Sequence, residues 1–331
     1  MNTKKLLILV SIAVIAILAI VFNEKLSSKK PSEKSLKFFD DKIGSFVIKD
    51  STGSVTIRKK GDVWVVSNDK SSSKEYPTDS ASVAVALEKI SGMKRSVLIS
   101  ENRDKQSLFE VDSSKGLFLE VFDLSAKSKG AMFIGKSGPD WNSNYVRLTS
   151  SDQVYTVEGG IRYSFFTELN RWRDKVMMSF DKESAKTITM VTKNGSAINL
   201  TKADSGKGWN LIAPVQSTAK ADEVDGILST LSRLNATDFQ DSLISDTALG
   251  FTKPELTISV GFANGSKKLS IGAKRSDGNY YAMIEGKETV YIVGQYDFSN
   301  LNKDLNTLKE EPPKAADTKK SPATAKTLKK K

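Results

Sequence analysis

The hydrophobic pattern of residues 46–293 predicts short β-strands, and the pattern occurs twice. In the first copy, a strand at 46–49 leads through a turn at Gly53 to a second strand, and Trp64 opens a third. In the second copy, a strand at 188–191, a turn at Gly195 and a strand opening with Trp209 repeat this order. An internal repeat of this kind predicts one domain fold used twice in tandem.

Each copy also contains a segment with the apolar spacing of a packed helix. Such spacing places the apolar side chains on one face, which can cover one side of a sheet. The two stripes comprise Val83, Leu87 and Ile90 in the first copy, and Val224, Ile227, Leu228, Leu231 and Leu234 in the second. The pattern then returns to strands, with 154–157 matching 290–293, and each copy closes on a short helix.

The sequence therefore predicts an α+β fold, in which an N-terminal transmembrane helix is followed by two tandem repeats of an antiparallel-sheet domain with packed helices. The expected parts are a membrane anchor at 1–25, a linker at 26–42, repeat domain 1 at 43–180, repeat domain 2 at 181–310 and a disordered Lys-rich tail at 311–331. Residues 172–181 lack the Gly/Ser composition of a loose linker, so a fairly stiff pair of domains is expected.

The apolar run from Leu6 to Phe22 has one polar residue, Ser11, and is interpreted as the anchor. As a helix it would span about 25 Å, slightly less than the hydrocarbon layer of roughly 30 Å. Leu6, Ile12 and Phe22 are then membrane-anchor residues, and flanking lysines can extend to the interface. A cleaved signal peptide is the alternative, although no small-x-small cleavage motif follows the run.

The charges around this run do not settle its orientation. More lysines follow the run than precede it, which fails to favour a cytoplasmic N-terminus. A short N-terminal tail nevertheless usually stays inside, and long downstream domains cross largely regardless of charge. The absence of Cys also fits an extracytoplasmic body. We expect a single-pass protein of the cytoplasmic (inner) membrane with its body on the periplasmic side.

The net charge of +11 is concentrated at the two ends of the chain. Residues 1–42 hold eight Lys and four acidic residues, and residues 311–331 hold seven Lys and two acidic residues. The body between them therefore carries only +2, so a basic face for nucleic acid is not expected. The Lys-rich ends support an alternative function, a cell-envelope protein that holds anionic polymer or lipid.

The chain contains no His and no Cys, which excludes His-dependent triads, Cys nucleophiles and thiolate or imidazole metal sites. Carboxylate or Ser-Lys catalysis stays formally possible. The acidic cluster at 222–225, however, falls in the first turn of an expected helix, where acids stabilise the helix dipole. We predict no catalytic residue, no cofactor and no metal, and therefore a protein that is not an enzyme.

One motif matches the phosphate-binding loop, since Gly130 is followed after four residues by Gly135, Lys136 and Ser137. That loop needs free backbone amides and a helix directly after it. Here the middle residues favour a strand, and the following Gly138-Pro139 would break a helix. The expectation is a strand, with no nucleotide bound.

Three residues are candidates for contact with a partner: Trp141, Tyr145 and Arg173. Trp141 and Tyr145 belong to a polar turn whose counterpart in the second copy, residues 275–281, has no Trp. A Trp at a polar hairpin tip suits a protein contact. The alternative is that it folds back onto its own sheet. Arg173 belongs to the run that joins the two copies.

Several of these motifs together resemble a family of bacterial membrane-anchored proteins that carry a domain of unknown function. The resemblance extends roughly from Phe46 to Leu308 and is clearest from Arg173 onward. It rests on Arg173-Asp174-Lys175, Phe180-Asp181, Ile188, Gly208-Trp209, Pro214, Leu249-Gly250-Phe251, Pro254, Ile271-Gly272, Tyr280-Tyr281 and 290–293.

Such proteins tend to be encoded beside gliding-motility-type (Gld-like) ABC transporters and their auxiliary components. The resemblance thus implies a membrane-anchored accessory or scaffold subunit, whose partners are the transporter permease, its ATPase and auxiliary membrane proteins. It carries no catalytic residues over, and it defines neither a cargo nor an oligomeric state.

Overall fold

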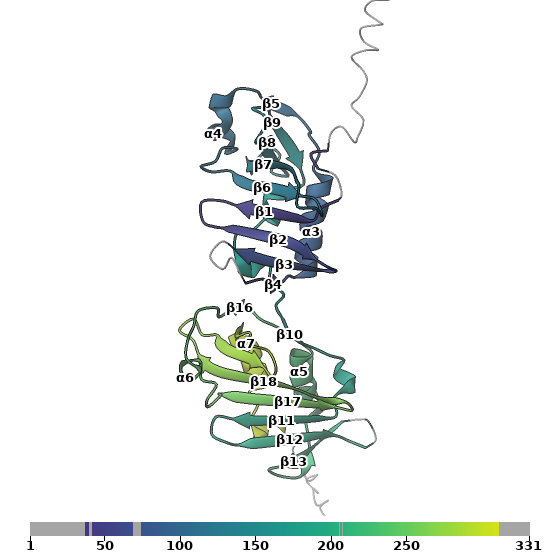
Figure 1. The fold of residues 1–331 in the computed structure, drawn as a ribbon. Coiled ribbons are helices and arrows are strands. Elements are labelled where there is room, and N and C mark those ends of the chain that lie inside the picture. Colours follow the sequence, from purple (N-terminus) through teal and green to yellow (C-terminus); the bar gives the residue numbers. More distant parts are fainter. Residues whose placement is uncertain (1–36, 40–41, 69–73, 205, 207, 311–331) are drawn as a thin grey trace, which may run out of the picture. The chain divides into compact units, whose positions relative to one another are not determined.

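The computed structural model describes residues 37–39, 42–68, 74–204, 206 and 208–310. The chain divides into two compact units between Asp174 and Lys175 (Figure 1). Each unit is built on one large antiparallel β-sheet, and the two units are described separately.

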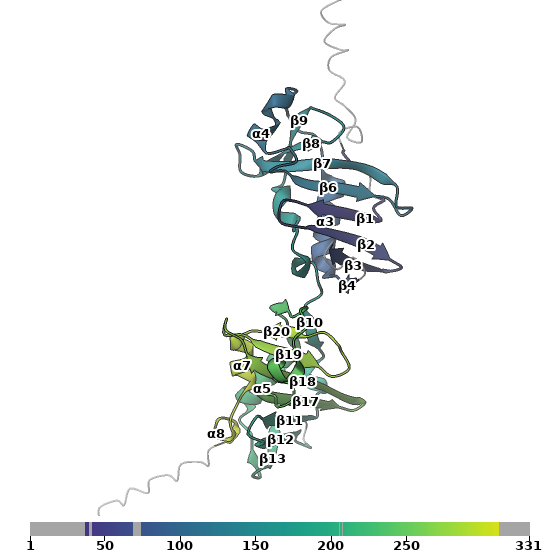
Figure 2. The ribbon, with the colours of Figure 1, turned by 60° about the vertical axis from the view of Figure 1, so that its left-hand side comes forward.

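Unit 1 contains a nine-stranded sheet in which every neighbouring pair is antiparallel (Figure 2). The N-terminal hairpin lies in the middle of this sheet, because β1 pairs with both β2 and β6. The order across the sheet is β4 (Tyr76–Pro77), β3 (Val63–Asn68), β2 (Ser54–Lys60), β1 (Ser45–Lys49), β6 (Leu117–Phe122), β7 (Ser128–Ser137), β8 (Ser143–Leu148), β9 (Val154–Glu158) and β5 (Leu98–Ser100).

Unit 2 repeats this order strand for strand. Its sheet runs β14 (Ser217–Thr218), β13 (Trp209–Ala213), β12 (Ala197–Lys202), β11 (Thr187–Thr192), β17 (Leu256–Phe262), β18 (Gly265–Lys274), β19 (Tyr280–Ile284), β20 (Tyr291–Val293) and β16 (Asp238–Phe239). A separate two-stranded ribbon pairs β10 (Val176–Ser179) with β15 (Arg233–Asn235).

The repeated residues occupy the same register in both sheets. Trp64 lies opposite Lys59, the sixth residue of β2, and Trp209 lies opposite Lys202, the sixth residue of β12. Tyr155 and Tyr291 likewise occupy matching places, since their partners Val146 and Ala282 pair in turn with Ile134 and Ile271. Residues can therefore be compared position by position between the units.

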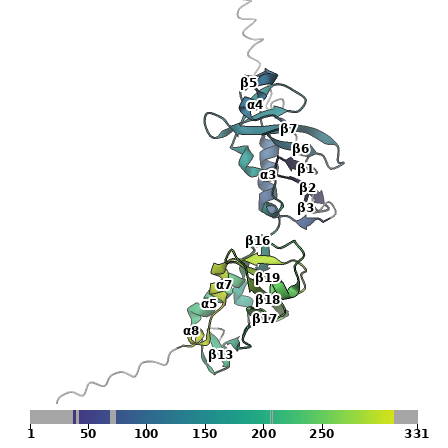
Figure 3. The same ribbon diagram turned by 90° about the vertical axis from the view of Figure 1, so that its left-hand side faces the viewer.

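One main helix packs on each sheet, α3 (Ser80–Gly92) in unit 1 and α5 (Ala221–Leu231) in unit 2 (Figure 3). Helix α3 begins at Asp79, whose carboxylate accepts a hydrogen bond from the Ser82 amide at 2.7 Å, as an N-cap does. Both helices bury the predicted apolar faces, although Leu87 is only partly buried and Leu234 lies in β15, after α5 has ended.

The remaining helices are short. Two single turns follow the main helices at matching places, α4 (Gln106–Phe109) and α6 (Asp246–Leu249). Unit 2 closes with α7 (Gln295–Leu301) and α8 (Leu305–Leu308), whereas unit 1 closes with the 3₁₀ turns η3 (Ile161–Ser164) and η4 (Leu169–Arg171). Two further 3₁₀ turns are η2 (Arg103–Lys105) and η5 (Lys182–Ser184).

The closing segment of each unit returns to the start of the main helix. In unit 1 the Asp79 amide donates to the carbonyl of Trp172 at 2.8 Å, and in unit 2 the Lys220 amide donates to the carbonyl of Leu308 at 2.8 Å. Both Trp172 and Leu308 are fully buried. The Trp172 indole is satisfied in the core, because its N–H donates to the Phe166 carbonyl at 2.9 Å. The two copies thus end at equivalent points, and each ends with one buried side chain.

The predicted α+β class with a transmembrane helix is wrong. The described chain consists mainly of two nine-stranded antiparallel sheets, and its longest helices, α3 and α5, have 13 and 11 residues. Within the described ranges, no helix combines the length and apolarity needed to cross a membrane. The proposed anchor residues Leu6, Ile12 and Phe22 lie outside those ranges.

The fold class was predicted wrongly because the two apolar stripes correspond to only a small amount of helix. A stripe shows that a helix exists but not how much of the fold it makes up, and here each stripe belongs to one short helix on a much larger sheet. The short closing helix predicted for the first copy is replaced by the 3₁₀ turns η3 and η4, and Phe165, which ends η3, is extended (φ −122°, ψ 111°).

Candidate functional site

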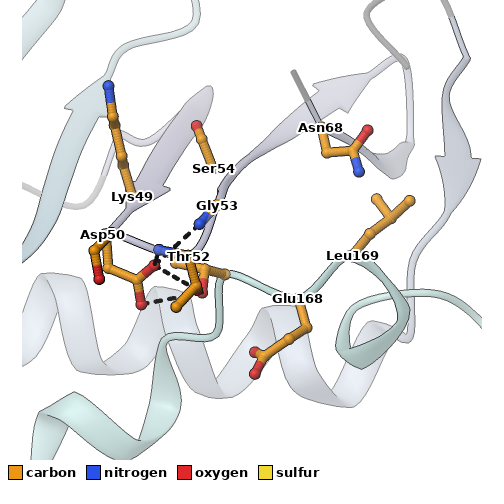
Figure 4. A pocket seen from close by; sticks show the side chains of 10 residues that line it. Lys49, Asp50, Thr52, Gly53, Ser54, Asn68, Glu168 and Leu169 are labelled. Carbon is orange, nitrogen blue, oxygen red and sulfur yellow. Dashed lines mark hydrogen bonds between the residues drawn. The ribbon is translucent and has the colours of Figure 1, made fainter. Parts of the chain in front are cut away.

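A polar pocket of about 550 Å³ lies in unit 1 between the β1–β2 turn and the segment that enters η4 (Figure 4). Asn68 and Leu169 lie across this pocket from Asp50. Its lining residues are Lys49, Asp50, Ser51, Thr52, Gly53, Ser54, Asn68, Thr167, Glu168 and Leu169. A pocket with acidic and basic side chains is the first place to look for chemistry.

The Asp50 carboxylate is fully engaged in holding the turn. It accepts hydrogen bonds from the Thr52 amide (2.7 Å) and hydroxyl (2.6 Å), from the Gly53 amide (3.2 Å) and from the Thr167 hydroxyl (3.2 Å). Partial burial alone would raise the pKa of Asp50, but these hydrogen bonds outweigh it and hold the pKa below its usual value. Asp50 therefore stays ionised and links the β1–β2 turn to the end of the unit.

This arrangement does not suit general acid–base catalysis. A catalytic acid or base needs a pKa moved toward neutrality, whereas the pKa of Asp50 moves away from it. Across the described residues, no group of three or more Asp, Glu, His or Cys side chains is placed to hold a metal ion. The pocket is best explained as the space beside the β1–β2 turn, which Asp50 links to Thr167, just before η4.

The phosphate-loop match lies inside a strand. Residues 128–137 form β7, and Ile134 pairs with Leu117 on one side and Val146 on the other. A Cβ atom added to Gly135 would lie 2.1 Å from the Phe109 carbonyl oxygen. The same holds in unit 2, where a Cβ on Gly272 would lie 2.1 Å from the Leu249 carbonyl oxygen. These glycines allow α4 and α6 to pack directly on the sheet.

Trp141 stands out at the turn between β7 and β8. Its side chain is 83% exposed, and its backbone has φ +59°, a left-handed conformation that costs an ordinary residue about 1–2 kcal/mol. The Trp141 amide donates to the Gly138 carbonyl at 3.2 Å. In unit 2 the equivalent amide, that of Gly278, donates to the Arg275 carbonyl at 3.1 Å with φ +90°. Unit 1 therefore has an exposed Trp where the turn favours glycine.

The turn that carries Trp141 is held firmly at its base. The Asn142 carbonyl accepts hydrogen bonds from the amides of Gly159 and Gly160 at 2.6 and 2.8 Å. Helix α4 packs on the face of β7 that Gly135 leaves open, while η3 lies against the core side, where the Arg162 guanidinium donates to the Ile134 carbonyl at 2.7 Å. A turn that is fixed at its base in this way loses little freedom on binding.

The other two candidate contacts have different surroundings. Tyr145 is half-buried, and its ring centroid lies 4.8 Å from that of Phe109, at the end of α4. Arg173 is 3% exposed, and its guanidinium lies 3.8 Å above the ring of Tyr76. Arg173 follows η4, whereas Trp141 lies in the turn between β7 and β8. Trp141 alone among the three presents its side chain to solvent.

The left-handed backbone at Trp141 was missed in the sequence analysis. The signal was present in the repeat, because Asp140-Trp141 aligns with Asp277-Gly278. Asp-Gly is a common pair in tight turns, and its glycine marks the position where φ is positive. A residue other than glycine at the aligned place is therefore worth examining wherever a domain is repeated.

Comparison with known proteins gives one match. A family model described as a domain of unknown function (DUF4340) matches residues 64–249 and, a second time, residues 209–320. Both matches begin at a repeated tryptophan, Trp64 or Trp209. No curated protein and no solved structure matches the chain.

Proposed function

We propose, from the premise that the chain belongs to the DUF4340 family of domains of unknown function, that it is a non-catalytic scaffold that binds a partner protein through the turn carrying Trp141. The family description assigns no activity, so the proposal rests on the residues themselves. Its main support is that Trp141 has no evident role in its own fold.

Two features of Trp141 support this proposal. A Trp that is 83% exposed buries little apolar surface within its own unit, and its left-handed backbone is unfavourable for any residue with a Cβ atom. Unit 2 builds the same turn with glycine at this position. Exposed Trp residues on rigid supports are frequent centres of protein interfaces, where burying the indole contributes several kcal/mol at the strongest sites.

The proposed setting is the bacterial cell envelope. The apolar run at 6–22 supports attachment to the cytoplasmic membrane, with the two units outside. The resemblance described above supports an ABC transporter as the complex that the scaffold joins, with the permease and auxiliary membrane proteins as the surfaces within reach of Trp141. The ATPase would then be part of the complex without touching Trp141.

The test is to capture the full-length protein from membranes solubilised in mild detergent, comparing wild type with Trp141→Gly. Glycine is the residue of unit 2 at this turn, so the variant should keep the fold and remove the contact. Tyr296→Ala is the matched control, because Tyr296 is also a largely exposed aromatic residue (77%) but lies in an ordinary helical turn of α7.

Wild type and Tyr296→Ala should capture an ATPase and a permease in similar amounts, and Trp141→Gly should capture at least tenfold less. Equal capture by all three proteins would contradict the role of Trp141. Capture of anionic wall polymer or lipid that is released by salt would instead favour the alternative function, binding through the Lys-rich ends.

A further inference from the structure

The outer strand of unit 1, β5, presents an apolar edge. It is the last strand of the sheet and pairs with β9. Its apolar residues and the one directly before it are unusually exposed for their type, with Val97 at 56%, Leu98 at 45% and Ile99 at 38%. In the described part of the chain, no strand pairs with the other side of β5. An apolar edge of this kind is a template for pairing with a further strand.

The corresponding edge of unit 2 is built differently. Leu98 pairs with Tyr155, and Phe239 pairs with the equivalent Tyr291, so β16 and β5 can be aligned. Phe239 is only 8% exposed, and its neighbours Asp238 and Gln240 stand where unit 1 has Val97 and Ile99. A charged or strongly polar residue on an edge strand discourages pairing. The apolar edge of unit 1 is thus not a requirement of the shared fold.

The backbone of β5 pairs irregularly with β9, because the register shifts between Leu98 and Ser100. The Thr156 amide donates to the Val97 carbonyl at 3.0 Å, so Val97 points its carbonyl toward β9. In an antiparallel ladder successive residues direct their N–H and C=O groups to opposite sides. The Ser96 amide also donates to Thr156, to its carbonyl at 2.9 Å, so this alternation is interrupted at residues 96 and 97. Pairing across Leu98 therefore requires residues 95–101 to straighten into a regular ladder with the second strand.

The residues around Leu98 are complementary to themselves in the antiparallel direction. When Leu98 is placed opposite Leu98 of a second chain, Val97 faces Ile99, Ser96 faces Ser100, and the positive Arg95 faces the negative Glu101. Apolar residues thus face apolar residues, polar residues face polar residues, and opposite charges face each other, as in stable cross-strand pairs. The same operation on β16 places Asp238 opposite Gln240 and Thr237 opposite Asp241, with no opposite charges paired.

We infer that β5 pairs with β5 of a second copy of this chain across a two-fold axis at Leu98, which joins two unit 1 sheets into one. The partner is a second copy because the seven residues 95–101 are complementary to themselves and a two-fold axis demands this property. The Arg95 guanidinium lies over the rings of Phe38 and Tyr155, 4.9 and 5.7 Å from their centroids, and the Glu101 carboxylate accepts a hydrogen bond from the Gln153 side-chain amide at 2.8 Å, so the pair between chains forms in competition with these contacts. The interface is separate from the turn at Trp141.

The full chain is the appropriate protein for testing this pairing. Lys37, the first described residue, forms a β-bridge with Lys94, so the N-terminal residues join unit 1 close to the edge in question. Because the chain contains no Cys, single cysteines report on one position at a time. A directly opposed, hydrogen-bonded antiparallel pair has its Cα atoms about 5.5 Å apart, within the range of a disulfide.

The experiment is oxidative crosslinking with copper phenanthroline on the full-length protein in membranes and in detergent. Leu98→Cys should form a disulfide-linked homodimer at least tenfold faster than the control Leu124→Cys, whose position is even more exposed (70%) but lies away from β5. The register provides the second arm. Val97→Cys mixed with Ile99→Cys should crosslink efficiently, because these two positions face each other. Val97→Cys alone should not, because the two copies of residue 97 are diagonal neighbours, and their spacing of roughly 7–8 Å is too long for a disulfide.

A charge exchange provides the third arm. Glu101→Arg should lower the Leu98→Cys crosslinking rate several-fold, and adding Arg95→Glu should restore it. Leu98→Cys that crosslinks no faster than Leu124→Cys, or that links only to other proteins, would overturn the inference. So would efficient crosslinking of Val97→Cys alone, since it would show a different register.

Discussion

Unit 1 and unit 2 place a glycine at the same point of the same strand, Gly135 in β7 and Gly272 in β18, yet they differ completely six residues later in the turn. Unit 1 has the exposed Trp141 there, and unit 2 has Gly278. The outer strands differ in the same manner, because Leu98 is exposed and Phe239 is buried. One sheet order is therefore combined with two different surfaces.

This difference separates two kinds of requirement. Where both copies share a residue type at a crowded position, the fold itself explains the choice, as it does for the two glycines beneath α4 and α6. Where one copy departs from the residue that its local geometry favours, the fold gives no explanation, and a contact outside the unit is the natural candidate. The departures lie in unit 1, which makes unit 1 the more promising place for partner binding.

The largest effect is expected at the two glycines that the units share. Gly135→Ala and Gly272→Ala should each destabilise their own unit by about 3 kcal/mol, because the new Cβ would overlap a backbone carbonyl that cannot move without displacing α4 or α6. Hydrogen exchange measured by mass spectrometry can read the two units separately. Fast exchange should appear in the unit that carries the substitution.

The control for these substitutions is Gly226→Ala. Gly226 lies inside α5, and a Cβ added there would meet nothing within 4 Å. Alanine should therefore stabilise unit 2 by roughly 0.5–1 kcal/mol through its better helix propensity. Similar protection for Gly135→Ala and the wild type would show that α4 does not depend on the close approach to the sheet.

A smaller effect is expected at the β1–β2 turn of unit 1. Asp50→Ala removes all the hydrogen bonds that the carboxylate accepts and should destabilise unit 1 by about 1–2 kcal/mol at neutral pH. Asp50→Asn keeps an acceptor oxygen and should cost less. Urea unfolding followed by Trp fluorescence suits this test, since Trp64, Trp141 and Trp172 all belong to unit 1.

The pH dependence of this effect has a definite sign. Because folding lowers the pKa of Asp50, its contribution is complete above the unfolded value, near 3.8, and is lost as the pH falls through the folded value. The stability difference between wild type and Asp50→Asn should shrink below about pH 4. A difference that stays constant from pH 7 to pH 3 would show that the charge of Asp50 has no part in holding the turn.

The turn at Trp141 should respond in the opposite direction. Trp141→Gly relieves the left-handed backbone at the cost of a more flexible unfolded chain, so unit 1 should keep its stability or gain up to about 1 kcal/mol. Gly278→Ala should cost unit 2 about 1 kcal/mol. If Trp141→Gly instead destabilised unit 1 by more than 1 kcal/mol, the indole would be serving its own fold and the argument for a partner would fail.

The sequence was most informative where the hydrophobic pattern is repeated. It indicated the strands around Trp64 and Trp209 and the helices that contain Val83 and Val224, because both periodicities are local properties of the chain. It did not reveal that β5 and β16 complete the sheets, since strands of two or three residues leave almost no periodic signal. The overall class was wrong for a related reason, as the number of strands in a sheet depends on long-range pairing.

The candidate site was only partly accessible from sequence. Trp141 could be singled out as an apolar residue in a polar turn, but its left-handed φ and the support at its base depend on contacts between distant segments, such as Asn142 with Gly159. Arg173 could not be placed, because its burial over Tyr76 joins residues almost a hundred positions apart. Local patterns identify unusual residues, whereas tertiary contacts decide what surrounds them.

The smallest expected effect is at Lys136, the lysine of the phosphate-loop match. Lys136 is exposed within β7, and the equivalent residue of unit 2 is Ala273. Lys136→Ala therefore makes unit 1 resemble unit 2 and should change stability by less than about 0.5 kcal/mol. Calorimetric titration of the full-length protein with ATP and Mg²⁺ should give no binding for wild type or variant, because the amides of β7 pair with neighbouring strands instead of surrounding a phosphate. Micromolar binding that Lys136→Ala abolishes would mean that unit 1 differs from unit 2 in chemistry as well as in surface, and the proposal of a non-catalytic scaffold would have to be given up.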